Sequence, residues 1–147
     1  MRTARDHIER LIFRYAELVD AGDFEGVSHM FESATITSEG SDHTTSGRKE
    51  VLAMYERSTR RYPNGTPHTR HLTTNLIIDV DDASVDAASR CYFTVLQAVP
   101  GELALQPVIA GRYHDSFTRT DGGWHFARRH MIIDLVGDLR HHLLFDL

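Results

Sequence analysis

The segment 68-HTRHLTTNL-76 combines histidines, threonines and an asparagine directly before an apolar run. A histidine here can carry a proton, bind a metal or serve a structural role. Because side chains alternate along a strand, His71, Thr73 and Asn75 are predicted to share one face, and Leu72 to lie on the opposite, ordinary packing face. The polar face leads into apolar residues, which is typical of a pocket wall. A lone histidine is more often structural, so His71 needs a partner to act as a base.

Asp20 is the best candidate for that partner. It follows a strongly apolar helix face and precedes Ala-Gly. Five residues separate Tyr15 from Asp20, about 140° around a helix axis, so both reach one cavity only if Asp20 lies at its rim or the helix loosens near Gly22. The alternative is that Asp20 is a solvated acid at the helix end.

A metal site is the other use for paired histidines. His68 and His71 have H-x2-H spacing, but a regular strand directs them to opposite faces. No acid or cysteine stands at a matching spacing. We therefore expect no bound metal, and we place His68 in an entry loop at the pocket rim. Cys91 is the only cysteine, which rules out a disulfide framework, and it is predicted to be a small core residue.

Three helices are predicted in the first part of the chain. Apolar residues recur at helical spacing in 4–23, 23–31 and 47–61. Asp23 and Ser46 stand where N-caps are expected, and Tyr55 is predicted to face inward. A short strand is predicted in 34–40, followed by a polar loop.

After residue 68 the apolar period changes from about four to two. Strands are predicted in 70–80, 85–99, 106–120 and 123–136, with turns at Asp81-Asp82, Pro100-Gly101 and Asp121-Gly122-Gly123. Residues 137–147 are expected to be a short helix or a tail, with His141 and His142 exposed to solvent or covering a pocket mouth. Helices followed by a long meander indicate an α+β fold. A curved, mostly antiparallel sheet wrapped on three helices makes a cone with an apolar interior.

Composition limits the class of protein. The chain has 147 residues, 41% of them hydrophobic and 25% charged, with a formal net charge of -5. We expect one domain over residues 1–147. Basic pairs are scattered, which argues against nucleic acid. No stretch is as apolar as a membrane span or a signal peptide, so a cytoplasmic location is expected.

Three segments, 14-RYAELVDAGDFEGVSHMF-31, 71-HLTTN-75 and 111-GRYHDSFTRTDGGWHFARR-129, resemble the SnoaL-like branch of the nuclear-transport-factor-2-like superfamily. The resemblance covers roughly residues 5 to 135. Its members include dehydratases, a dehydrochlorinase, polyketide cyclases, ketosteroid isomerase and noncatalytic subunits. It implies the cone-shaped α+β barrel described above, and it implies a pocket more firmly than a reaction.

The dehydratase and dehydrochlorinase members pair an aspartate with a histidine, and these positions fall on Asp20 and His71. The resemblance also implies catalytic roles for Tyr15, as a hydrogen-bond donor, and for Arg129, as a stabiliser of negative charge. Tyr55 is a loose counterpart of a second dehydratase tyrosine. The full set expected to contact substrate is Tyr55, Tyr113, Asn75, Thr73 and His68.

Two departures from other members matter. The base of ketosteroid isomerase corresponds to Ser38, with Glu39 beside it, which argues against steroid isomerisation by that mechanism. The second histidine of scytalone dehydratase matches His114 only approximately.

The chemistry that the dyad supports is base-promoted elimination or isomerisation of a small hydrophobic or polycyclic substrate, without cofactor or metal. Polyketide-type ring closure and a noncatalytic role, such as a ligand-binding protein or a small dioxygenase subunit, are the alternatives. A homodimer or homotrimer is expected.

Overall fold

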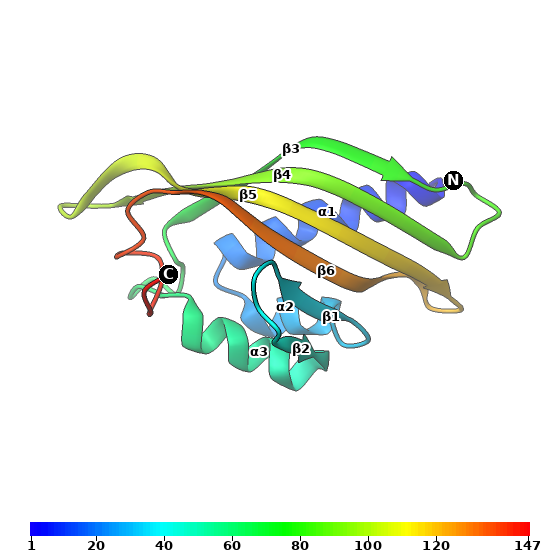
Figure 1. Ribbon diagram of the computed structural model, residues 1–147, viewed down its shortest axis with the longest axis horizontal. Coiled ribbons are helices and arrows are strands. Elements are labelled where there is room, and N and C mark those ends of the chain that lie inside the picture. Colours follow the sequence, from blue (N-terminus) through cyan, green and yellow to red (C-terminus); the bar gives the residue numbers. More distant parts are fainter.

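The computed structural model describes residues 1–147 and shows three helices packed on a curved sheet of six strands (Figure 1). The helices are α1 (Ala4–Asp20), α2 (Phe24–Met30) and α3 (Gly47–Ser58). The strands are β1 (Thr35–Ser38), β2 (Thr44–Ser46), β3 (Thr69–Asp79), β4 (Asp86–Val99), β5 (Leu103–Thr120) and β6 (Gly123–Val136). The predicted α+β fold is confirmed.

The sheet has the order β2-β1-β6-β5-β4-β3. All neighbouring strands are antiparallel except β1 and β6, which are parallel. The four long strands curve over α1, while α2 and α3 lie below with the short strands (Figure 1). Strand β3 is therefore an edge strand, and α1 packs along it.

The helix starts follow from local hydrogen bonds. Thr3 and Asp6 form a capping box at the start of α1, and Asp23 caps α2 as predicted by accepting from the Gly26 backbone N–H at 2.9 Å. Ser46 occupies the N-cap position of α3 as predicted, but its side chain makes no capping bond. Ser46 also ends β2, a strand that was predicted as loop, and its backbone N–H donates to Glu50 at 2.6 Å.

Strand β3 does not alternate regularly along its length. Asn75 has φ 53°, and the pairing with β4 shifts register between Thr74 and Ile77. Before this bulge His71 points inward, and after it Ile78 does, because an inserted residue reverses the alternation. The predicted packing face is therefore correct only after the bulge, where Ile78 is 3% exposed, and wrong before it, where Leu72 is 39% exposed.

The C-terminal segment 137–147 forms no helix, and backbone hydrogen bonds hold it against the end of α3. Leu143 bridges Thr59. The Leu144 backbone N–H donates to the Ser58 carbonyl, and the Arg60 N–H donates to the His142 carbonyl, both at 2.9 Å. The chain end consequently lies beside α3 (Figure 1). None of the helices combines the length and the apolar character needed to cross a membrane.

Gly22, just after α1, sets a tight approach between two segments. Its φ is +73°, and a Cβ there would lie 1.9 Å from the Gly65 carbonyl oxygen. Gly65 also has positive φ, +84°, but a Cβ there would meet nothing within 4 Å. The two glycines therefore form a matched pair that differs in steric contact alone.

We predict that Gly22→Ala lowers the free energy of unfolding by about 2–4 kcal/mol, from backbone strain plus the displaced loop. Gly65→Ala should lower it by about 1–2 kcal/mol, from strain alone. Urea denaturation measures both losses, and equal losses would contradict the steric argument.

Candidate active site

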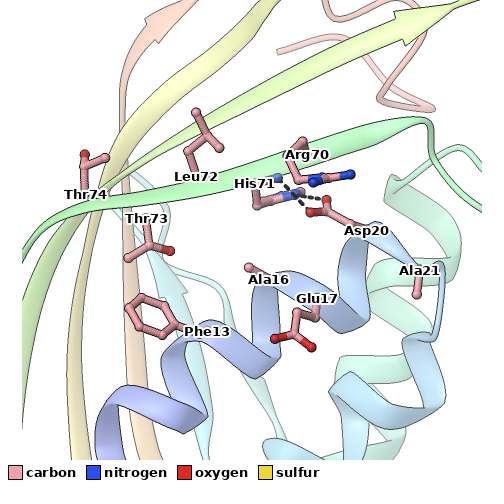
Figure 2. Close-up of a pocket in the computed structure, with 10 residues that line it drawn as sticks. All are labelled: Phe13, Ala16, Glu17, Asp20, Ala21, Arg70, His71, Leu72, Thr73 and Thr74. Atoms are coloured by element: carbon pink, nitrogen blue, oxygen red, sulfur yellow. Dashed lines mark hydrogen bonds and ion pairs between the residues drawn. The ribbon is translucent and has the colours of Figure 1, made fainter.

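Asp20 and His71 meet where the end of α1 touches the edge strand β3 (Figure 2). The Nδ1 atom of His71 lies 2.6 Å from Oδ1 of Asp20. The His71 backbone N–H donates to Oδ2 at 2.8 Å, and the Thr69 hydroxyl donates to Oδ1 at 2.9 Å. The side chains of His71 and Asp20 are only 8% and 13% exposed. The predicted partners are thus in direct contact and largely shielded from solvent.

Local structure explains this contact. Helix α1 ends at Asp20 because the chain turns at Gly22, whose N–H returns to the Val19 carbonyl at 2.9 Å. The carboxylate at this corner points at β3 (Figure 2). Since β3 pairs with a strand on one side only, the outward N–H of His71 is left for Asp20.

The hydrogen bonds decide what the imidazole can do. An ionised Asp20 accepts a proton-bearing Nδ1, so in neutral His71 the lone pair is on Nε2. No protein group hydrogen-bonds that Nε2. A proton taken up there produces an imidazolium beside a carboxylate, which is stabilising.

A groove of about 620 Å³ runs between α1 and β3 and reaches the dyad. Its wall includes exposed apolar side chains, notably Phe13 and Leu72, beside polar ones (Figure 2). The lining residues are Phe13, Ala16, Glu17, Asp20, Ala21, Arg70, His71, Leu72, Thr73 and Thr74. Of the residues predicted from the sequence, only Asp20, His71 and Thr73 line it.

The predicted tyrosines and Arg129 form a separate cluster in the core. The hydroxyls of Tyr15 and Tyr55 are 2.5 Å apart. The Arg129 guanidinium lies over the rings of Tyr15, at 4.2 Å, and Tyr113, at 3.8 Å. All four residues are buried. We predicted that these residues share one open cavity with Asp20 and His71. They do not line the groove, because aromatic packing fills this part of the cone.

Asp115 is the residue that sequence reasoning missed. Both of its carboxylate oxygens accept from Arg129, from Nε and Nη2, at 2.9 Å. Both side chains are 0% exposed. Although burial alone lowers the pKa of Arg129, the Asp115 charge raises that pKa above its usual range. The sequence did contain a signal for Asp115. Every second residue of a strand points to the same face, which places Asp115 with Tyr113 and Phe117 on the buried face of β5.

Burial also keeps the neighbouring tyrosine hydroxyls and the cysteine thiol protonated. It raises the pKa values of Tyr55 and Tyr113 well above the usual range, and it raises the pKa of the Cys91 thiol to about 11. Cys91 is 2% exposed, in agreement with its predicted place in the core.

Two residues expected to contact substrate lie elsewhere. His68 packs edge-on against Tyr62, with ring centres 4.7 Å apart, and lines a different pocket near the β4–β5 turn. Asn75 is exposed at the bulge, beside a small pocket with Arg90. The bulge explains why Asn75 does not line the groove, because it turns the Asn75 side chain away from the face of β3 that carries His71.

A different histidine lies near the dyad. His114 is exposed. His142, predicted to be exposed to solvent or to cover a pocket mouth, is 6% exposed, and its ring centre lies 6.3 Å from that of His71. Burial, and then the proximity of His71, lowers the pKa of His142 from 6.5 to about 4. Nowhere in the structure do three or more candidate metal-ligating side chains gather.

The SnoaL-like domain family matches residues 1–130. The chain belongs to the SnoaL-like family. No curated protein matches the sequence significantly. The family assignment confirms the resemblance found in the sequence.

Solved structures share the fold of this SnoaL-like protein. A nuclear-transport-factor-2-like protein with a cystatin-like fold from Novosphingobium aromaticivorans is 25% identical, with a TM-score of 0.72, over 88% of this chain and 81% of the other. A protein of unknown function from Mycobacterium tuberculosis is 26% identical, with a TM-score of 0.69, over 88% and 70%. A candidate scytalone dehydratase from Novosphingobium aromaticivorans is 24% identical, with a TM-score of 0.69, over 89% and 84%, which shows the fold alone.

The buried pair Asp115–Arg129 has an exposed counterpart of similar geometry on the same sheet. Arg112 donates to Asp134 through two nitrogens at 2.9 Å, with both side chains about 40% exposed. Asp115→Ala should lower the free energy of unfolding by about 3–5 kcal/mol, because it leaves a buried charge unpaired. Asp134→Ala should lower it far less, because solvent and salt screen the exposed pair. Denaturant titration measures both, and similar losses would contradict the role of burial.

The shifted pKa of His142 predicts a pH dependence of stability. An unfolded His142 binds a proton near pH 6.5, while the folded one resists until about pH 4. Its contribution is therefore fully present above pH 6.5 and is lost as pH falls, at a limiting rate of about 1.4 kcal/mol per pH unit. Comparing wild type with His142→Leu at pH 7.5, 6.0 and 4.5 isolates this slope. Parallel profiles would contradict the buried neutral state.

Proposed function

We propose that this SnoaL-like protein is a cofactor-independent lyase or isomerase in which Asp20 and His71 form the acid–base dyad. The observation that carries the proposal is the 2.6 Å contact between Asp20 Oδ1 and His71 Nδ1, at a groove. It leaves Nε2 as the free basic atom. Membership of a family with a dehydratase-like structural neighbour supports an enzyme.

In this mechanism His71 takes a proton from a substrate C–H bond through Nε2. Asp20 holds the tautomer beforehand and stabilises the imidazolium afterwards. The freed electron pair then expels a leaving group or shifts a double bond, and the proton on His71 returns to the leaving group or to another carbon. A positioned general base of this kind contributes about 10²–10⁴-fold to a rate.

The groove supports a small hydrophobic or polycyclic substrate. Its volume of about 620 Å³ suits an organic molecule of that size. Phe13 and Leu72 are 41% and 39% exposed, so apolar surface is open to a ligand. Thr73 provides a hydroxyl next to His71 on the same face of β3.

Polyketide-type cyclisation shares the first step and differs in the fate of the carbanion, which then forms a carbon–carbon bond. A noncatalytic binding protein or subunit requires no proton transfer at all. Analysis of the products distinguishes cyclisation from elimination or isomerisation. Dependence of the rate on His71 distinguishes an enzyme from a noncatalytic protein. The expected homodimer or homotrimer stays a prediction, measurable by size-exclusion chromatography with light scattering.

The base assignment can be tested with 5-nitrobenzisoxazole, whose ring opening requires proton removal from carbon. Wild type should accelerate the reaction, and His71→Ala and Asp20→Asn should each lower kcat by about 10²–10⁴-fold. His43→Ala, which removes an exposed histidine from a loop, is the matched control and should keep the wild-type rate. Circular dichroism verifies that each variant is folded. A wild-type rate no higher than that of His71→Ala would overturn the proposal.

A further inference from the structure

A second imidazole lies beside the dyad and comes from the C-terminal segment. The rings of His142 and His71 have centres 6.3 Å apart and planes inclined at 67°. His142 is 6% exposed. A buried histidine normally satisfies its ring nitrogens with protein partners, and His142 does not.

The ring nitrogens of His142 differ in their surroundings. Nδ1 is enclosed and has no hydrogen-bond partner. An enclosed donor without an acceptor is less favourable than an enclosed acceptor without a donor, so Nδ1 bears the lone pair and Nε2 bears the proton. Nε2 is not fully enclosed, and no protein group accepts its hydrogen. His142 therefore has a free N–H donor.

The position of this ring is fixed by backbone contacts. The His141 carbonyl accepts from the Tyr62 hydroxyl at 2.5 Å and from Gln97 Nε2 at 2.9 Å. The His142 carbonyl accepts from the Arg60 N–H at 2.9 Å. The segment is thus held without using either nitrogen of the His142 ring. His142 is not part of the groove wall, but its ring lies beside His71, which is. A fixed ring with unused polar atoms in that place is suited to contact a ligand bound at His71.

We propose that His142 is a second substrate-contacting residue, whose Nε2–H binds the substrate oxygen on which negative charge develops as His71 removes a proton. The inference rests on the proposed function of the dyad. In the step, the substrate C–H bond breaks and its proton moves to Nε2 of His71. The electron pair moves toward the oxygen, which accepts a hydrogen bond from His142 without receiving its proton.

The proposal narrows the substrate class. The acidic C–H must lie close to an oxygen that can take up charge, as in an enolisable carbonyl compound or one that forms a phenolate. The ring centres of His71 and His142 are 6.3 Å apart, a separation that one such group spans. A simple halide elimination without oxygen would leave His142 unused.

The neutral state of His142 fits this role. Its pKa near 4 results from burial and then from His71, while Asp20 acts in the opposite direction. At neutral pH the ring is therefore an uncharged donor, as when a neutral imidazole polarises a carbonyl. His71 of β3 and Asp20 of α1 are the titratable groups that act on it.

The rate test uses 5-nitrobenzisoxazole, in which proton removal develops charge on a phenolate oxygen. His142→Leu should lower kcat by about 10–100-fold and change KM by less than about threefold, because the donor acts mainly in the transition state. His142→Gln, which retains an N–H donor, should recover most of the loss. His141→Leu is the matched control in the same segment and should keep the wild-type rate. A wild-type kcat in His142→Leu, with His71→Ala inactive, would overturn the proposal while leaving the dyad intact.

A binding test does not depend on turnover. Addition of 4-nitrophenolate to protein with ¹⁵N-labelled histidines should shift the Nε2 resonance of His142, and His142→Leu should weaken binding about tenfold. If phenolate fails to bind, binds without that shift, or binds both proteins equally, the role of His142 is overturned. If the shift occurs but the wild type does not accelerate the elimination, the dyad proposal fails and the His142 contact stands.

Discussion

The carboxylate of Asp20 joins the last turn of α1 to the edge strand β3 through three hydrogen bonds. It accepts from the ring and the backbone of His71 and from the Thr69 hydroxyl. A single side chain therefore closes the seam between helix and sheet, orients the imidazole and supplies its counter-charge. Each of these effects depends on the helix ending at Asp20, which follows from the left-handed turn at Gly22.

Two of the carboxylates that pair with a cationic or basic side chain, Asp115 and Asp20, lie in different environments. Asp115 and Arg129 are fully enclosed, share two hydrogen bonds and lie among aromatic rings, and the second terminal nitrogen of Arg129 has no hydrogen-bond partner. Both charges are buried in the interior. Asp20 and His71 lie at a groove, and the outer nitrogen of His71 is unused. Full burial of an ion pair among packed rings favours a structural role, whereas partial burial with one free basic atom favours chemistry.

Membership of the SnoaL-like family accounts for the cone and the helices, but the fold supports several reactions. The local features of this chain are the contact between Asp20 and His71 at the α1–β3 seam, a cone interior filled by three tyrosines and Arg129, and a C-terminal segment that brings His142 close to His71. The segment is held by the end of α3 and by β4, so an element remote in sequence completes the surroundings of His71.

The sequence by itself determined the elements that strong apolar periodicity marks, namely three helices and four long strands. It also offered Asp20 as the best candidate to pair with His71, and the family resemblance, rather than local spacing, favoured that pair over a solvated acid at the helix end. It did not place Asn75, because the bulge depends on a positive φ there, a conformation that asparagine tolerates but that its presence alone does not predict. Only the tertiary structure decided which buried positions are paired with which. Asp115 became the partner of Arg129 through strand register, and His142 reached His71 because long-range backbone hydrogen bonds fold the chain end back. Contacts of this kind depend on the path of the backbone between distant residues, which local spacing does not specify.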